Sequence, residues 1–437
     1  MASPTLTSPA LGSITAETIE RALGAQAGAP AGWLERKRAA YERVAALPMP
    51  QRTDESWRFS SIAGVNLDSL EPLAPAAPTA RPHVPDFAPL TSLSFVNNRL
   101  HGRTALPPEL AAKGVVVTTF SEALTRHGDL LKAHFMAQPQ RLGSEKFAAL
   151  HAAFVGDGAF IYIPRGVELD GPILVVHAAS GAGASVFPHT LVVAEENSKV
   201  TVIDFFTSPA NEPLFACGAN DLYAGHGSKL TYAAVQNWSR KALSFQLNST
   251  VVRRDARVQS LNIHLGGRQA RHESLSQLQA PGAFSEMLAL TVASDSQEFD
   301  QRTLQVHQAP NTKSDLLYKN ALLETAKTIF SGLIIVDPDA QKTDAYQSNR
   351  NLVLSDGAEA NSLPGLEIQA NDVRCTHGAT TSRVDPEQMF YLQARGITPV
   401  YARELLVFGF FEEVLNRLES EELHAALRTL LKSKLKL

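Results

Sequence analysis

Cys375 and His377 are the residues of this chain best suited to hold a metal ion or sulfur. They lie in the segment 371–380, where a strand-rich middle gives way to a helical tail. In an extended strand their spacing of two residues places both side chains, together with Val373, on one face. A thiolate beside an imidazole suits iron, zinc or sulfur chemistry. An iron–sulfur cluster usually takes about four protein ligands, so we expect another subunit to complete the site.

Other catalytic motifs are missing from the sequence. It has no Gly-x-x-x-x-Gly-Lys-Ser/Thr loop for nucleotides, no Cys-x-x-Cys, no His-Glu-x-x-His and no Gly-x-Ser-x-Gly. Cys217 reads as a small core residue. Among the thirteen histidines, we interpret four as surface or turn residues: His177, His189, His264 and His272.

Composition narrows the class of protein. The 437 residues carry a formal net charge of −4, which gives no sign of a nucleic-acid partner. Two cysteines exclude a disulfide framework and indicate a reducing compartment. The start of the chain lacks the pattern of a signal peptide, and no apolar run approaches the roughly 20 residues that cross a bilayer. We therefore expect a cytoplasmic protein with no membrane contact.

Residue patterns divide the chain into four regions. Residues 1–70 are expected to form an N-terminal helical domain, which Pro48-Met-Pro50 interrupts. Residues 71–152 combine a connector, with six prolines between Glu71 and Pro89, and a mixed helical segment that includes one strand at 92–96. Residues 153–384 are predicted to be a β-helix core, and 385–437 a C-terminal helical domain.

A weak repeat runs through the third region. A turn residue, a small residue and an alternating apolar strand recur, clearly in Asn197-Ser-Lys-Val-Thr-Val and Gly227-Ser-Lys-Leu-Thr-Tyr. With the second residue as the marker, the copies fall at positions 198, 228, 256, 282, 312, 340 and 372. A period of this size without helices is typical of stacked turns that share one core. A jelly roll or another β-sandwich is the alternative.

The fourth region contains an apolar helix that could bind a partner. A short helix at 387–394 is expected to stop at Gly396, and a longer one to start at Pro399. The run Val407-Phe-Gly-Phe-Phe411 is apolar on more than one face. The stripe either packs against its own domain or forms a docking surface.

Several segments together resemble the SufB/SufD family of iron–sulfur cluster assembly scaffolds. The segments that carry this resemblance are Trp57-Arg-Phe after Pro48-Met-Pro, 154–167 (FVGDGAFIYIPRGV), 307–314 (HQAPNTKS), Gly332-Leu-Ile, 373–381 (VRCTHGATT) and 385–397 (DPEQMFYLQARGI). They span nearly the whole chain. Within the family, Cys375-x-His377-Gly378 resembles the SufD branch, and Ser348 stands where a similar SufB segment has a cysteine.

The resemblance implies a fold and a set of partners. The fold would be a right-handed parallel β-helix between N-terminal and C-terminal helical domains. The chain would be a non-enzymatic scaffold subunit that pairs with SufB through the end of its β-helix and binds the ATPase SufC on its C-terminal helices; a homodimer is also possible. Cys375 and His377 would share a transient iron or iron–sulfur cluster with SufB. The residues expected to dock SufC are Tyr401, Leu405, Phe408 and Phe411.

Two other functions remain open at this point. A carbohydrate-active β-helix enzyme would need clustered carboxylates. Asp295, Glu298 and Asp300 are close in sequence, but Glu298 and Asp300 lie at a strand end and show no evident basic partners. A purely structural adaptor with no metal role would share the fold and the SufC contact.

Overall fold

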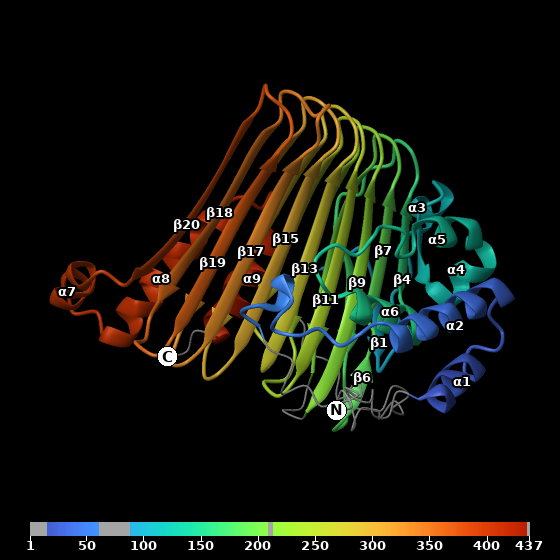
Figure 1. The fold of residues 1–437 in the computed structure, drawn as a ribbon, viewed down its shortest axis with the longest axis horizontal. Coiled ribbons are helices and arrows are strands. Elements are labelled where there is room, and N and C mark those ends of the chain that lie inside the picture. The colour runs from blue at the N-terminus through green and yellow to red at the C-terminus, as the bar shows by residue number, and fades with distance from the viewer. Residues whose placement is uncertain (1–14, 61–87, 209–212, 435–437) are drawn as a thin grey trace, which may run out of the picture.

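A long stack of parallel strands forms the body of the molecule (Figure 1). The computed structural model describes residues 15–60, 88–208 and 213–434. Helices surround the N-terminal end of the stack, and further helices lie beside its C-terminal part. Most of the predicted proline-rich connector, residues 71–87, lies outside the described residues. Among the described helices, none is long and apolar enough to cross a membrane.

The strands form two sheets. Sheet A has the spatial order β3 (Val116–Thr119), β4 (Ala159–Ile163), β7 (His189–Ala194), β9 (Leu214–Ala224), β11 (Leu243–Val252), β13 (Gln269–Leu278), β15 (Glu298–His307), β17 (Lys327–Val336) and β19 (Glu359–Ile368), with β6 (Ala184–Val186) beside β9. Sheet B has the order β2 (Arg99–Arg103), β1 (Thr91–Val96), β5 (Ile173–Ala178), β8 (Lys199–Thr207), β10 (Lys229–Asn237), β12 (Arg257–His264), β14 (Phe284–Ala293), β16 (Lys313–Leu322), β18 (Asp344–Val353) and β20 (Arg374–Arg383).

Each turn of the chain gives one strand to each sheet, from the pair β4–β5 to the pair β19–β20, which makes eight turns. Successive turns pair in parallel, as in β16 with β18 and β18 with β20. Among the described strands, only β1–β2 and β3–β4 pair antiparallel, and both pairs lie at the N-terminal end. The predicted parallel β-helix is therefore confirmed, and a sandwich is excluded.

The corners between the sheets explain the repeat in the sequence. Residues with left-handed backbone stack at one corner, and their φ values lie between 53° and 77°: Asn197, Gly227, Asp255, Gly282, Asn311 and Lys342. Glycine, asparagine and aspartate tolerate this conformation best, which accounts for five of the six. Each of these residues donates its backbone N–H to a carbonyl of the next corner, for example Asn197 to His226 at 2.8 Å.

A small, buried residue follows each left-handed residue and directly precedes the first residue of the strand. The observed positions are 198, 228, 256, 283, 312 and 343, with Val373 in the last turn, so the period is 27 to 31 residues. Four of the seven predicted positions are correct. The predicted positions 282, 340 and 372 are wrong by one, three and one residues, because Gly282 itself takes the left-handed conformation and Lys342 does so against its usual preference.

Helices close the N-terminal end of the stack. Their bounds are α1 (Ala16–Gly24), α2 (Ala31–Ala46), η1 (Glu55–Trp57), α3 (Pro108–Ala112), α4 (Phe120–Arg126), α5 (Gly128–His134) and α6 (Glu145–Phe154). Their apolar side chains, including Trp33, Phe120 and Phe147, form one core with Phe215 and Phe245 of sheet A. The antiparallel β3 and β1–β2 hairpin complete this end, so the first turns of the stack are covered.

Two lysines join α2 to α6. Lys37 of α2 donates to the carbonyl of Val155, the C-cap of α6, and Lys146 of α6 donates to the carbonyls of Val44 and Leu47 at the end of α2. A cation at a helix C-terminus interacts favourably with the unpaired carbonyls and with the helix dipole. Lys37 is buried without a carboxylate among its hydrogen-bond partners in the described part of the chain, and burial lowers its pKa to about 7.

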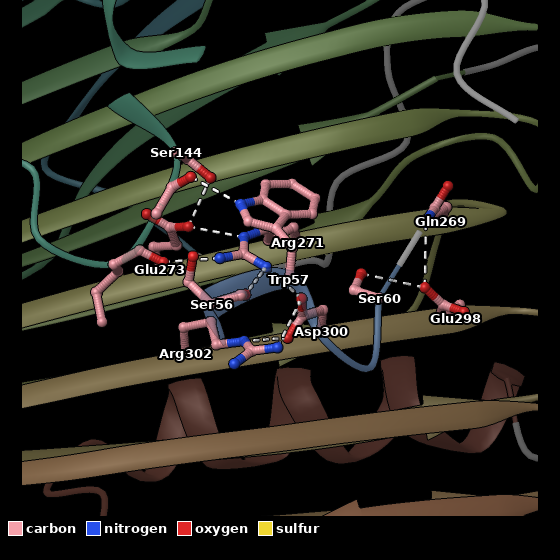
Figure 2. Close-up of polar contacts among 12 residues, drawn as sticks. Ser56, Trp57, Ser60, Ser144, Gln269, Arg271, Glu273, Glu298, Asp300 and Arg302 are labelled. Atoms are coloured by element: carbon pink, nitrogen blue, oxygen red, sulfur yellow. Dashed lines mark hydrogen bonds and ion pairs between the residues drawn. The ribbon is translucent and has the colours of Figure 1, made fainter. Parts of the chain in front are cut away.

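A second connection ties the N-terminal segment to the middle of sheet A (Figure 2). The guanidinium of Arg271 on β13 donates to the carbonyls of Ser56 and Leu142 at 3.0 and 2.7 Å, and it lies 3.8 Å from the centre of the Trp57 ring. The same group donates to Glu273 and Asp300 at 2.7 and 2.5 Å. One buried arginine therefore joins two strands of the stack to two loops that are distant in sequence.

The C-terminal helices are α7 (Pro386–Ala394), α8 (Pro399–Leu415) and α9 (Glu421–Lys434). Asp385 and Thr398 cap the first two, since their side chains accept from the backbone N–H groups of Glu387 and Tyr401. The apolar faces of α8 and α9 pack on the outer face of sheet B, where Phe411, Val414 and Leu427 contact residues such as Leu288 and Leu317.

The pH dependence of stability should reveal the buried amine of Lys37. Between pH 7 and its ordinary pKa of 10.5, the unfolded chain binds a proton that the folded chain does not. The free energy of unfolding should therefore rise with pH across this window, by up to about 1.4 kcal/mol per pH unit from this group. Urea unfolding of wild type and Lys37→Met between pH 7 and 10 should show this slope in their difference. The exposed Lys132→Met is the control; an equal slope for both variants would contradict the assignment.

Removal of Arg271 should cost far more stability than removal of a surface arginine. Arg271→Ala leaves Glu273 and Asp300 buried with less compensation, and breaking a buried ion pair typically costs about 3–5 kcal/mol. Arg38→Ala, which breaks an exposed pair with Glu20, should cost far less stability, because solvent screens surface ion pairs. Chemical denaturation followed by circular dichroism measures both, and similar losses would show that Arg271 is not a central connection.

Candidate functional site

The C-terminal end of the stack is open. β19 and β20 are the last strands of their sheets, and neither contains a buried residue. By contrast, the inward residues of β17 and β18, one turn earlier, are almost all buried. In Figure 1 this end lies opposite the helices that close the N-terminal end. Each of the two strands therefore has one edge of backbone N–H and C=O groups with no neighbouring strand in the described part of the chain.

Cys375 and His377 lie on this last turn. Cys375 is in register with Ala345 and His377 with Gln347, two residues of β18 whose side chains are buried. Both therefore lie on the inner face of β20, over the exposed end of the core. Cys375 is half-buried and packs near Ile334 and Ala345, whereas His377 is exposed. Val373 belongs to the same cluster, as the spacing predicted.

The thiol of Cys375 is protonated when the chain is alone. Burial raises its pKa, and the nearby Asp344 acts in the same direction, although a hydrogen bond from the backbone of Ala345 opposes them. Cysteine binds metals as the thiolate, so metal binding here must displace a proton. Among the described residues, no group of three or more His, Cys, Asp or Glu side chains could hold a metal ion. Cys375 and His377 alone make an incomplete site.

Polar side chains line the inside of the stack up to this open end. Asn320 donates to Asn351 at 2.8 Å, and Asn351 donates to Ser362 of β19 and to Thr381 of β20 at 3.1 and 3.3 Å. In the next layer Oε1 of Gln347 is buried and has no hydrogen-bond partner among the described residues. The inner surface of the last turn is therefore mixed: it is polar around Asn351, Ser362 and Thr381 and apolar around Leu366, Val373 and Cys375.

Ser348 lies apart from these residues. It is the neighbour of Gln347 on β18, so its side chain is on the opposite, outer face of the strand, and it is buried in register with Gly378. The structure therefore places it on the other side of the sheet from Cys375 and His377.

The predicted docking residues divide into two groups. Phe408 and Phe411 are 6% and 0% exposed, because they pack between α8, α9 and sheet B. The expectation that these two form a partner surface is wrong for this conformation; they belong to the core of the chain. Tyr401 and Leu405, at the start of α8, are 54% and 38% exposed and remain available.

Two aromatic residues that the sequence analysis missed extend the available surface. Phe390 and Tyr391 on α7 are 74% and 56% exposed, and Val400 is also exposed. Beside them, α7 and Leu406 of α8 line a shallow groove of about 730 Å³. We call Phe390, Tyr391, Val400, Tyr401 and Leu405 the aromatic surface. A pair of aromatic residues in a short helix of nine residues was the signal in the sequence.

The four histidines interpreted as surface residues are all buried, which corrects that interpretation. His177 lies between the rings of Phe95 and Phe206. A hydrogen bond of 2.8 Å joins Nδ1 of His189 to Nε2 of His151, and Nε2 of His189 lies 3.1 Å from the carboxylate of Asp221. His264 and His272 stack at 3.8 Å between ring centres. Burial lowers the pKa of His177 and of His272 to about 3, so these side chains are neutral structural groups.

The carboxylates considered for a carbohydrate-active enzyme form ion pairs and hydrogen bonds in the structure. Asp300 is buried and pairs with Arg271 and Arg302, so the interpretation that it lacks basic partners is wrong. Glu298 accepts from Ser60 and Gln269 at 3.3 and 3.1 Å (Figure 2). Asp295 pairs with Arg240 at the surface. Two of the three therefore act in attaching the N-terminal segment.

Comparisons with known proteins agree with this architecture. Residues 30–175 match the family model described as the SufBD protein N-terminal region, and residues 176–410 match the one described as SUF system FeS cluster assembly, SufBD core domain. The iron–sulfur cluster assembly protein SufD of Bacillus subtilis is 28% identical over 413 residues, which cover 92% of this chain and 94% of that protein.

Two further relatives are described as iron–sulfur cluster assembly SufBD family proteins. The protein of Synechocystis sp. is 28% identical, over 90% of this chain and 89% of its own length. The protein of Mycobacterium leprae is 31% identical, over 64% of this chain and 71% of its own length.

Proposed function

Because the chain belongs to the SufBD family of iron–sulfur cluster assembly proteins, we propose that it acts as a scaffold subunit that pairs with SufB through the open end of its solenoid. The observation that carries the proposal is this open end, where both potential ligands, Cys375 and His377, lie on the inner face of the last strand. Both the family and the geometry support a role in holding a nascent cluster.

The free edges of β19 and β20 favour a partner that is itself a stack of strands. Exposed strand edges pair readily with strands of another chain, because their backbone groups need partners. Exposed apolar residues at the same end, Leu363 and Ile368, would be covered in such a contact. SufB is the proposed partner, and a second copy of this chain would use the same edges in its absence.

The cluster is cargo in this proposal, not a resident cofactor. Cys375 and His377 would give one sulfur and one nitrogen ligand, and SufB would give the others. Since the pKa of Cys375 is raised, the free thiol is a weak ligand until iron arrives and replaces its proton. Such a site holds iron or a cluster loosely, which suits a protein that must release its product.

The aromatic surface is the proposed contact for SufC. Exposed aromatic side chains on a soluble protein often mark a binding surface, and Tyr and Trp are frequent at the centre of interfaces. Among the described residues, α7 and the start of α8 carry the most exposed aromatic side chains of the chain. ATP-driven movement of two SufC copies would then pull on these helices.

Ion pairs connect α8 to the strands next to the site. Glu413 accepts from Lys319 of β16 and, at 3.0 Å, from Arg350 of β18. Lys319 also donates to the carbonyl of Phe410 at 2.7 Å. β18 in turn pairs with β20, which carries Cys375 and His377. A movement of α8 would therefore act on the strand beside the proposed ligands.

A structural adaptor with no metal role is the second candidate. It would use the same open end and the same aromatic surface, so the fold does not separate the two functions. The half-buried thiol and exposed imidazole on one face favour the scaffold function, because a purely structural edge needs neither.

Replacement of His377 should lower the cluster content of the assembled complex. His377→Ala removes one of the two proposed ligands, and we expect iron retention to weaken on the order of tenfold, as when a metal site loses a supporting group. Anaerobic reconstitution followed by iron and sulfide analysis of the purified complex measures this. The exposed His101→Ala on β2, at the opposite end, is the matched control.

The subunit ratio must be measured together with the cluster content. An intact complex with unchanged cluster content in His377→Ala would remove His377 from the site and favour the adaptor. Loss of SufB from the complex would instead show that His377 acts in subunit pairing.

A charge in the aromatic surface should weaken SufC binding. Tyr391→Glu places a carboxylate where an aromatic contact is proposed, and a change at the centre of an interface typically costs about 2 kcal/mol or more, which is roughly 30-fold in affinity. Pull-down or titration with purified SufC tests this, with Leu100→Glu at the N-terminal end as the control. Equal SufC affinity for both variants would move the docking site elsewhere.

A further inference from the structure

Three basic residues form a row on the outer face of sheet B. Lys229 of β10 is in register with Lys199 of β8 on one side and with Arg257 of β12 on the other. The residues that follow them, Val200, Leu230 and Val258, are buried in the core, so the three basic side chains are on the outer face. Neighbouring parallel strands lie about 4.8 Å apart, which brings the three positive charges close together.

Nearby carboxylates do not neutralise this row. Among the described residues, no ion pair joins Lys199, Lys229 or Arg257 to an acidic side chain, although Arg257 lies over the ring of Phe284. The two closest acidic residues on the following strands, Glu286 and Asp315, are already bound by Arg417 at 3.0 and 2.8 Å. Like charges side by side on adjacent strands are unfavourable unless a counter-ion binds between them.

Beyond Arg257, Phe284 of β14 interrupts the row, and Lys313 of β16 is the next basic residue. It occupies the equivalent register position but pairs with Asp344 of β18 at 3.3 Å.

At the opposite end of the row, Glu168 forms a parallel β-bridge with Lys199, so an acidic residue stands beside that end as well. The positive charge is therefore concentrated on the middle of the row, at Lys229 and Arg257. The positive part coincides with a groove.

The connection between α8 and α9 covers the groove. One part, of about 320 Å³, is lined by Lys199, Lys229, Arg257 and Arg417, with Glu286 and Glu419 as its carboxylates. The adjoining part, of about 440 Å³, shares Lys199 and Glu419 and adds Asp170. Its other lining residues include the apolar Leu169, Ile203, Leu418 and Leu423, the hydroxyl-bearing Thr201, Thr231 and Ser420, and Gln259.

We propose that this groove binds a phosphate-bearing small molecule. Its phosphoryl group would lie between Lys199, Lys229 and Arg257, and its less polar body would enter the part lined by Leu169, Ile203 and Leu423. A phosphate group carries up to about two negative charges on three acceptor oxygens. Several cations that converge on one place therefore bind a phosphate better than they bind a single carboxylate. The hydroxyl groups of Thr201 and Thr231 supply further donors at the wall.

The position of the groove gives such a ligand a structural effect. It would contact strands β8, β10 and β12 on one side and the α8–α9 connection on the other. Binding would therefore hold the C-terminal helices against the solenoid. This effect does not depend on the proposed pairing with SufB or on the ligands Cys375 and His377, which lie on β20.

Calorimetric titration of the full chain with pyrophosphate and with adenosine monophosphate, at about 50 mM salt, tests the proposal. We expect both probes to bind. The nucleotide should have the higher affinity, because its adenosine group enters the apolar part of the groove. The double variant K229A/R257A should weaken binding at least about tenfold, since it removes two charge-assisted contacts. K313A, at the equivalent register position, should bind as wild type does.

Each remaining outcome overturns the proposal. The absence of binding by either probe at millimolar concentration would show that the row is only a solvated surface. Equal affinity of K229A/R257A and K313A would place the bound phosphate elsewhere. Tighter binding of a hexaglutamate peptide than of both phosphate probes would assign the groove to an acidic protein segment. The substituted residues Lys229, Arg257 and Lys313 are exposed strand-start positions, and the thermal unfolding of each variant should match wild type.

Discussion

Parallel pairing of successive turns is the constraint on which this structure depends. No turn can satisfy its own backbone or bury its own inner face, so each relies on the next. Register is kept over long strands, as between β16 and β18 and between β18 and β20. The stacked left-handed corner residues, from Asn197 to Lys342, hold the strand starts level. Polar residues can therefore line the interior, because Asn320 and Asn351 find partners one turn away.

The same constraint explains why potential function collects at one end. At the N-terminal end the antiparallel β1–β2 and β3–β4 pairs and the helices satisfy the first turns. At the other end the last turn has no successor, so its backbone edges, its inner surface and the side chains of Cys375 and His377 are accessible. Helices α8 and α9 return to the outer face of sheet B, and α7 buries none of its own residues. Neither β19 nor β20 has a buried residue, so this end stays uncovered.

Much of the fold could be predicted because its signals are local. Asn197, Gly227 and Asp255 favour the left-handed corner, and the alternation after them is a strand signal, so the repeat is visible. The face shared by Cys375 and His377 follows from a two-residue spacing. The contacts between side chains of different turns could not be predicted, because they depend on the register of strands that are distant in sequence. Asp300 finds Arg271 one turn away, and His264 finds Gln301, contacts that no local pattern contains. Phe408 and Phe411 looked available because an apolar stripe does not show which surface covers it.

The contrast between a covered first turn and an unfinished last turn also gives the stack a direction. At the N-terminal end the helices around β1 to β4 cover the apolar core, and among the described strands there only the edge strand β2 is largely exposed. At the other end both sheets finish in strands without a buried residue. Two such stacks joined through their β19–β20 edges would therefore point in opposite directions, with the helices of each at the far ends of the pair.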